Sequence, residues 1–270
     1  MRRYSSVDVA TPSKYSNMTA TWIRDNLLPP LLKRALTRGQ RRKEEIERFR
    51  TLYGSFVANG DLCFDIGANF GNRVRCMRAL GCKVVAVEPQ GLCLRRLRKE
   101  FGEDRHVILE PKAAGAAPGT AIMRTSEVHV LSTLSDAFVQ KTRASGRFAA
   151  VTWSGEETVA VTTLDALITA HGMPRFVKIY VEGFESEVLA GLSHRVPALS
   201  FEWTPEIPEN SLSFLSRLTG LGNYEFNYSW GESMRFARST WLDELAMKRV
   251  VEEFAGENQM FGDIYARLRR

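Results

Sequence analysis

The sequence predicts an α/β protein with a doubly wound, mostly parallel sheet and helices on both of its faces. Short apolar runs without polar alternation, at 62–66 and 83–87, are typical of strands that are buried on both faces of a parallel sheet. Segments of helical periodicity separate such runs, and the connections between them are short. A turn containing glycine joins the first run to the helix that follows it.

The elements alternate along the chain, and a last strand after a helical segment is expected to run antiparallel. We predict strands at 62–66, 83–87, 106–110, 120–124, 157–162, 176–181, 198–203, 224–230 and 263–268. We predict helices around 74–80, 94–101, 164–171, 185–192, 210–218 and 242–254, several with a glycine close behind. Residues 113–161 show little regular pattern apart from two strands, so we interpret them as an irregular insertion or lid over a site.

The 270 residues fit one enlarged α/β domain with a basic extension. Residues 1–60 carry 12 Lys and Arg against 5 Asp and Glu, a net charge of +7. Since the whole chain is +6, the other 210 residues sum to −1. We therefore expect a partly helical N-terminal extension at 1–51 and one folded domain at 52–270. A nucleic-acid-binding domain would carry the basic excess throughout, so no nucleic-acid partner is expected.

The segment 22–36 combines Trp22 with leucines and with Arg and Lys. Two interpretations stay open: a helix that rests on anionic lipid, or packing against the domain or a second subunit in a homodimer. No run approaches the roughly 18–20 apolar residues of a membrane span, and the first 21 residues lack a signal-peptide pattern. Four cysteines show neither zinc spacing nor a disulfide framework, which favours a cytoplasmic location.

The loop at 64–72 (Phe-Asp-Ile-Gly-Ala-Asn-Phe-Gly-Asn) follows a buried strand and opens a helix, which is typical of a ligand-binding turn. Gly67 allows a tight turn, Gly71 allows close approach, and free amides there suit a carboxylate or phosphate. Asn69 and Asn72 occupy the second and third glycine positions of a dinucleotide loop, so NAD and FAD are disfavoured.

Glu88 lies 21 residues after Gly67, at the end of the second strand, where a carboxylate can accept bonds from both ribose hydroxyls. An adenosyl ligand without a pyrophosphate and with an amino-acid carboxylate fits S-adenosylmethionine. Asn69 and Arg73 are candidates for that carboxylate, and Asp65 would be a costly buried charge unless paired. The alternative is a structural glycine turn with Glu88 on the surface.

Several motifs occur in order along the chain: the 64–72 loop, Val87-Glu88-Pro89, Val-Thr-Thr-Leu-Asp at 161–165, Phe-Val-Lys-Ile-Tyr-Val-Glu-Gly-Phe-Glu at 176–185, and Gly-Asp-Ile at 262–264. Together they resemble the FkbM-like methyltransferase family. The resemblance implies a Rossmann-like class I fold, S-adenosylmethionine as donor, and O-methylation of a saccharide or other small metabolite. It places Asp65, Gly67, Ala68, Asn69 and Gly71 at the methionine end, Glu88 at the ribose and Ala113 near the adenine, and Asn72 and Pro89 are also expected to bind the cofactor.

One position departs from the family pattern Lys-Ile-Asp-x-Glu-Gly, because Tyr180 stands where the family has Asp. Tyrosine is a poor ligand for a hard divalent cation, so no metal is expected. Tyr180 and Glu182 are two apart on a predicted strand and should face the same side. Glu182 is the candidate base and Tyr180 a hydrogen-bond donor or aromatic wall; Glu182 capping the next helix, or Glu202 acting as base, are alternatives.

Two other functions stay open. Because of Tyr180, the chain can instead be a non-catalytic adenosyl-binding or interaction protein. A nucleic-acid methyltransferase is a weaker hypothesis that rests on the pI of about 9.2, and the Asn/Asp-Pro-Pro-aromatic signature of amino-methylating enzymes is missing. His129, in the predicted lid, either touches substrate or is a polar loop residue.

Overall fold

The computed structural model describes residues 43–44, 46–146, 148, 150–231, 233–257 and 261–269. The chain divides into two compact units, Met1–Glu45 and Ile46–Arg270. The predictions for 22–36, and for most of the extension at 1–51, lie outside the described residues. In the part of the chain that is described, no helix is both long and apolar enough to cross a membrane.

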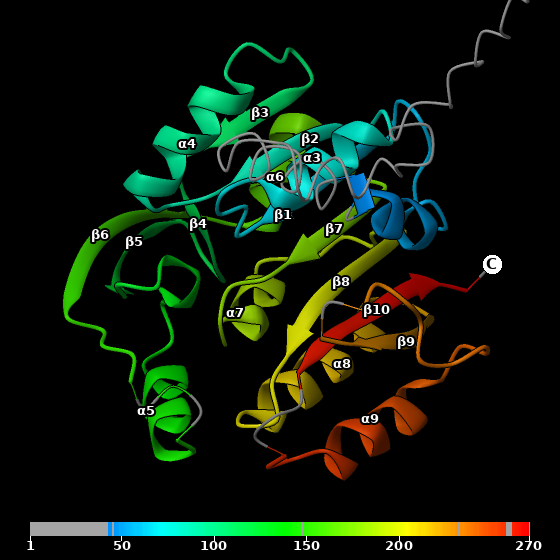
Figure 1. Cartoon of the computed structure of the whole chain (residues 1–270). Helices are drawn as coiled ribbons and strands as arrows, with labels where there is room; N and C mark the ends of the chain where they lie inside the picture. Colours follow the sequence, from blue (N-terminus) through cyan, green and yellow to red (C-terminus); the bar gives the residue numbers. More distant parts are fainter. Residues whose placement is uncertain are drawn as a thin grey trace, which may run out of the picture. The chain divides into compact units, whose positions relative to one another are not determined.

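The main sheet runs in the order β3-β2-β1-β7-β8-β10-β9 within the described residues (Figure 1). Its strands are β1 (Leu62–Ile66), β2 (Lys83–Val87), β3 (Val107–Glu110), β7 (Phe176–Ile179), β8 (Ala198–Trp203), β9 (Tyr224–Trp230) and β10 (Gly262–Leu268). The first five strands of this order pair in parallel, and β10 pairs antiparallel with both β8 and β9. The predicted α/β fold with an antiparallel C-terminal strand is confirmed.

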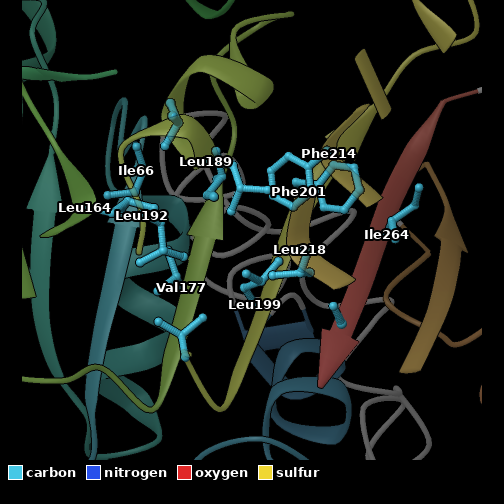
Figure 2. Packing of buried hydrophobic residues seen from close by; sticks show 14 of the residues in the cluster. Ile66, Leu164, Val177, Leu189, Leu192, Leu199, Phe201, Phe214, Leu218 and Ile264 are labelled. Atoms are coloured by element: carbon cyan, nitrogen blue, oxygen red, sulfur yellow. The ribbon is translucent and has the colours of Figure 1, made fainter. Parts of the chain in front are cut away.

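Helices cover both faces of this sheet. Helical residues 46–53, α3 (Asn72–Ala79) and α4 (Gly91–Phe101) pack their apolar side chains on one face. The other face is covered by α6 (Leu164–His171), α7 (Glu185–Ala190), α8 (Pro208–Leu221) and α9 (Glu244–Glu253). Figure 2 shows this second core, where the Phe201 ring of β8 stacks on the Phe214 ring of α8 with centroids 3.7 Å apart.

The folded domain begins earlier than the predicted boundary at residue 52. The side chains of Phe49, Leu52 and Tyr53 are almost fully buried, and the Tyr53 ring packs edge-on against Phe176 of β7. The second compact unit accordingly starts at Ile46, inside the segment that we expected to belong to the extension.

Residues 113–161 are more ordered than the sequence predicts. They contain β4 (Ala113–Ala114), β5 (Gly119–Thr125), a short 3-10 helix η1 (His129–Leu131), α5 (Asp136–Ala144) and most of β6 (Gly155–Thr162). β6 pairs with β4 in parallel and with β5 in antiparallel fashion, which makes a small second sheet (Figure 1). The predicted strands 120–124 and 157–162 are β5 and β6, whereas β4, η1 and α5 were not predicted, so this region is more regular than expected.

Candidate functional site

A cavity of about 530 Å³ lies at the carboxyl ends of β1, β2, β7 and β8. Ligand pockets in proteins span about 300–1,000 Å³, so its size suits a small organic molecule. The small sheet and the segment after it supply the remaining wall. Of the predicted site residues, nine lie on the wall: Gly67, Ala68, Asn69, Asn72, Glu88, Pro89, Ala113, Tyr180 and Glu182.

The loop after β1 is a tight turn whose amides are already engaged. Gly67 has φ of 79°, and a Cβ there would lie 1.9 Å from the Tyr180 carbonyl oxygen, so only glycine fits. Its amide and that of Ala68 donate to the Val87 carbonyl, while the amide of Asn69 donates to Glu88 Oε2. Since Phe70 and Gly71 also donate within the loop, the prediction of free amides is wrong for residues 67–71.

Glu88 is buried at the end of β2, with 2% of its surface exposed. Its Oε2 accepts from the Asn69 amide and its Oε1 from the Gln90 amide, both at 2.8 Å. Burial raises the pKa of this carboxyl to about 7, against the lowering effect of these two amides. The alternative of a surface carboxylate is wrong, and Glu88 lines the cavity next to Pro89.

Asp65 and Gly71 are not on the cavity wall. Asp65 is fully buried, and Lys178 Nζ of β7 lies 3.8 Å from its Oδ1; Lys178 and Arg73, not Asp65, reach the wall. Gly71 faces α4 instead, because a Cβ there would lie 2.5 Å from the Phe101 ring. Neither residue lines the cavity, and their place at the methionine end stays a prediction; Asp65 does have the charged partner that its burial requires.

Asp65 belongs to a row of polar residues on the sheet face under α3 and residues 46–53. Asp65 pairs in register with Lys178, and Lys178 pairs with Ser200 of β8. Glu202, two residues further along β8, lies opposite Asp263 of β10. Burial lowers the pKa of Lys178 and raises that of Asp65, and their mutual attraction opposes both shifts.

Tyr180 and Glu182 lie beyond the end of β7, which stops at Ile179. Glu182 has φ of 52° and Gly183 φ of 84°, so the chain turns sharply and the two-residue spacing does not put the side chains on one strand face. That part of the prediction is wrong, although both residues reach the cavity wall. Thr133 Oγ1, from the segment after the small helix η1, donates to the Glu182 carbonyl at 2.7 Å.

The carboxylate that fixes this turn is Glu185, for which no role is predicted from the sequence. Glu185 is 2% exposed, and its Oε1 accepts from the Val181 amide at 3.0 Å. Its Oε2 accepts from Asn210 Nδ2 of α8 at 2.8 Å. Glu185 therefore has the structural role at the start of α7 that was an alternative for Glu182. A glutamate at the first helical position after Gly183 and Phe184 is the signal that was available.

His129 forms part of the cover over the loop after β1. Its ring lies 3.9 Å, centroid to centroid, from the Phe70 ring, and its carbonyl accepts from Gln90 Nε2 at 3.1 Å. Burial and the nearby Arg96 guanidinium lower the pKa of His129, so the neutral ring is favoured. Its neighbours in sequence, Val130 and Leu131, are on the cavity wall.

The residues present fit an adenosyl donor. Glu88 is a buried acceptor beside the wall, Asn72 and the cations Lys178 and Arg73 offer partners for an amino-acid carboxylate, and Ala113 and Met123 give an apolar surface for a base. Across the described ranges, no group of three or more His, Cys, Asp or Glu side chains is arranged to hold a metal ion.

A glycine turn after β1, an acidic residue after β2 and a cavity at the carboxyl ends of a 3-2-1-7-8-10-9 sheet define a Rossmann-like class I methyltransferase fold. Residues 65–228 match the methyltransferase FkbM domain, and the chain belongs to this family. No curated protein matches the chain.

Three solved structures illustrate the likeness to known folds. Precorrin-6y C5,15-methyltransferase from Geobacter metallireducens is 11% identical, with 84% of this chain and 87% of that chain covered and a TM-score of 0.43. The C-terminal domain of the Rhodobacter capsulatus precorrin-6Y enzyme is 11% identical, with 82% and 88% covered and a TM-score of 0.39. An rRNA methylase from Streptococcus thermophilus is 9% identical, with 84% and 95% covered and a TM-score of 0.40.

Proposed function

We propose that this protein transfers a methyl group from S-adenosylmethionine to a hydroxyl group of a saccharide or another small metabolite. The observation that carries the proposal is Glu88, a buried carboxylate that holds the loop after β1 by the Asn69 amide and lies on the cavity wall. The bound donor would supply an electrophilic methyl group on a sulfonium centre.

The residues that line the cavity would contact different parts of the donor, according to the strand that each one follows. Glu88 accepts bonds from the ribose hydroxyls, and Ala113 and Pro89 flank the base. Arg73 and Lys178 attract the carboxylate of the methionine moiety, because they are the cations that the wall offers near the loop after β1. The loop between Gly67 and Asn72 limits water access, and positioning of the acceptor supplies much of the acceleration.

A hydroxyl acceptor is favoured by what lines the other end of the cavity. Phe148, Phe184 and Tyr180 line the cavity together with Glu182 and Glu202, which are on or after β7 and β8. Apolar faces with a few polar acceptors suit a small ligand that carries hydroxyl groups. Either carboxylate can take the proton that the hydroxyl loses, and such proton transfer contributes about 10²–10⁴-fold.

Calorimetric titration of the full chain with S-adenosylmethionine tests the donor, and transfer of a labelled methyl group to methyl glycosides of common hexoses tests the acceptor class. We expect saturable binding to one site and label in a glycoside. Absence of donor binding would refute the proposal. Donor binding without transfer to any acceptor would favour the second candidate, a non-catalytic adenosyl-binding protein, which Tyr180 at the family's Asp position favours.

The expectations about partners and location stay predictions. Flotation of the full chain with anionic liposomes, against a chain that begins at Leu52, would distinguish lipid contact through 22–36 from packing on the domain or on a second subunit. Binding of DNA or RNA that survives about 0.2 M salt would contradict the expectation of no nucleic-acid partner.

A further inference from the structure

The strand order assigns the two ends of the cavity to different groups. Glu88 follows β2, the glycine turn follows β1, Tyr180 follows β7, and Glu202 lies near the end of β8. Neighbouring strands are about 4.8 Å apart, so β8 lies about 10 Å from β1 along the edge. If the proposed donor lies over β2 and β1, its methyl group points toward β7 and β8, where Tyr180, Glu182 and Glu202 line the wall.

Glu202 is the more rigidly placed of the two carboxylates at that end. Its strand neighbours Phe201 and Trp203 are buried in the core under α8 and α9, so the strand directs the Glu202 side chain to the opposite face. Only 6% of Glu202 is exposed, yet it reaches the cavity wall. Its Oε2 is buried with no hydrogen-bond partner among the described residues. A buried acceptor of this kind needs a donor, and the cavity is where a ligand can provide one.

Tyr180 follows the neighbouring strand, and its hydroxyl lies close to the Glu202 carboxyl, whose pKa it lowers. The Lys178 ammonium lies 4.2 Å from the centroid of the Tyr180 ring. Glu182, by contrast, is partly exposed in a left-handed turn and is held through its main-chain carbonyl by Thr133. The position of its carboxylate therefore depends on a turn, whereas that of Glu202 is set by a central strand.

We infer that Glu202, oriented by the Tyr180 hydroxyl, is the carboxylate that takes the proton of the acceptor hydroxyl, and this inference rests on the proposed function. In the step, the acceptor oxygen forms a bond to the methyl carbon and the bond from that carbon to sulfur breaks. The electron pair of the broken bond stays on sulfur, which becomes a neutral thioether. The hydroxyl proton moves to Glu202 Oε2.

The charges around Glu202 decide when its carboxyl is ionised. They come from Lys178 of β7, Tyr180 after it, Asp263 of β10, Glu182 in the turn and Glu185 of α7. Burial and then the nearby carboxylates raise the pKa of Glu202 well above its ordinary value, and the Tyr180 hydroxyl opposes this. The raised pKa favours the protonated form in the free protein, whereas the positive charge of a bound donor would favour ionisation, so Glu202 can accept a proton once the donor is bound.

The test uses a probe that needs no acceptor. Sinefungin, an analogue of the donor, carries a charged amine where S-adenosylmethionine carries the methyl group, whereas S-adenosylhomocysteine carries nothing there. We expect wild type to bind sinefungin more tightly than S-adenosylhomocysteine and to release more protons on doing so, measured by calorimetry in buffers of different ionisation enthalpy. Glu202→Gln should lower this preference at least tenfold and abolish the extra proton release.

The rival and control variants decide the outcome. Glu182→Gln should change the preference less than threefold, and so should Glu110→Gln, the last residue of β3, whose carboxylate contacts His171 and Lys112. An unchanged preference in Glu202→Gln, or an equal loss in Glu182→Gln, would overturn the inference while leaving the proposed function intact. If the wild-type protein binds neither nucleoside, the proposed function fails first.

A second variant covers the case in which Glu202→Gln does not fold. Tyr180→Phe leaves the carboxylate in place but removes the neighbouring hydroxyl, which lowers the pKa of Glu202 and so favours its ionised form. The pH at which the sinefungin preference appears should therefore move upward, while the affinity for S-adenosylhomocysteine stays within about threefold. A positioning role for Tyr180 is supported by that shift, and a midpoint that stays in place overturns it together with the role of Glu202.

Discussion

Replacing Glu88 by alanine tests how this fold would recognise the donor. The carboxylate accepts two amide bonds at 2.8 Å, from Asn69 and Gln90, and retains lone pairs for the two ribose hydroxyls. Hydrogen bonds to charged groups contribute about 1.5–3 kcal/mol each, so losing even one weakens binding at least tenfold. Losing both predicts a decrease of about 100-fold or more. The two orphaned amides should also reduce the free energy of unfolding by about 1–3 kcal/mol each, less if water replaces the carboxylate.

The assay compares two ligands to separate ribose contact from disorder of the loop. Calorimetry would measure S-adenosylhomocysteine and its 2′,3′-dideoxy analogue on wild type and Glu88→Ala, with Glu110→Ala as the matched control at the end of the next strand. We expect the variant to lose affinity for the first ligand and very little for the second. Equal losses for both ligands would show that Glu88 acts only by holding the loop, and equal affinity in variant and wild type would refute the ribose assignment entirely.

Three further predictions concern stability. Gly67→Ala should lower the free energy of unfolding by about 2–5 kcal/mol, because φ is positive there and the added Cβ would meet the Tyr180 carbonyl. The control Gly119→Ala, where the added Cβ meets nothing within 4 Å, should change it by less than about 1 kcal/mol. Urea denaturation measures both variants, and similar values for the two would contradict the steric argument. Lys178→Met should cost about 3–5 kcal/mol by leaving Asp65 buried without its cation, and adding Asp65→Asn should recover part of the loss; strictly additive single effects would exclude the pairing. The pKa of Glu88 is about 7 in the folded protein against an ordinary value of 4.5, so the free energy of unfolding should fall by up to about 3 kcal/mol as pH rises from about 4.5 to 7. Denaturation at several pH values measures this slope, and Glu88→Gln should remove it. A slope that persists in Glu88→Gln would show that other groups cause it.

Most strands of the main sheet could be predicted closely because they are buried on both faces and bounded by turn residues. The predicted ranges for β1, β2, β8 and β9 agree with the structure at both ends. β7 ends two residues before its predicted limit because Glu182 and Gly183 adopt left-handed conformations. Because Val181 is apolar, the strand pattern in the sequence extends to it, but this pattern does not show where the backbone turns.

The site was predictable where a residue's role follows from its position at a strand end, as for Gly67 and Glu88. It was not predictable where the role depends on a partner far along the chain. Asp65 lies in a matching motif, yet it does not line the cavity, and its charged partner Lys178 comes 113 residues later. The free oxygen of Glu202 depends on pairing with both β7 and β10, and neither register can be read from the sequence of β8.

The two faces of the sheet explain why the charged groups can be both buried and useful. The face under α6 to α9 is packed almost entirely with apolar side chains, whereas the face under α3 carries Asp65, Lys178, Glu202 and Asp263. Burying these charges has a cost, which the opposing charges offset only while the strands hold them in register. The same register fixes the distance between the loop after β1 and the carboxylate on β8. A variant in which these four residues lost their register would therefore lose the fixed separation between donor and proton acceptor, together with part of its stability. On this argument the polar face is a rigid support for the proposed methyl transfer.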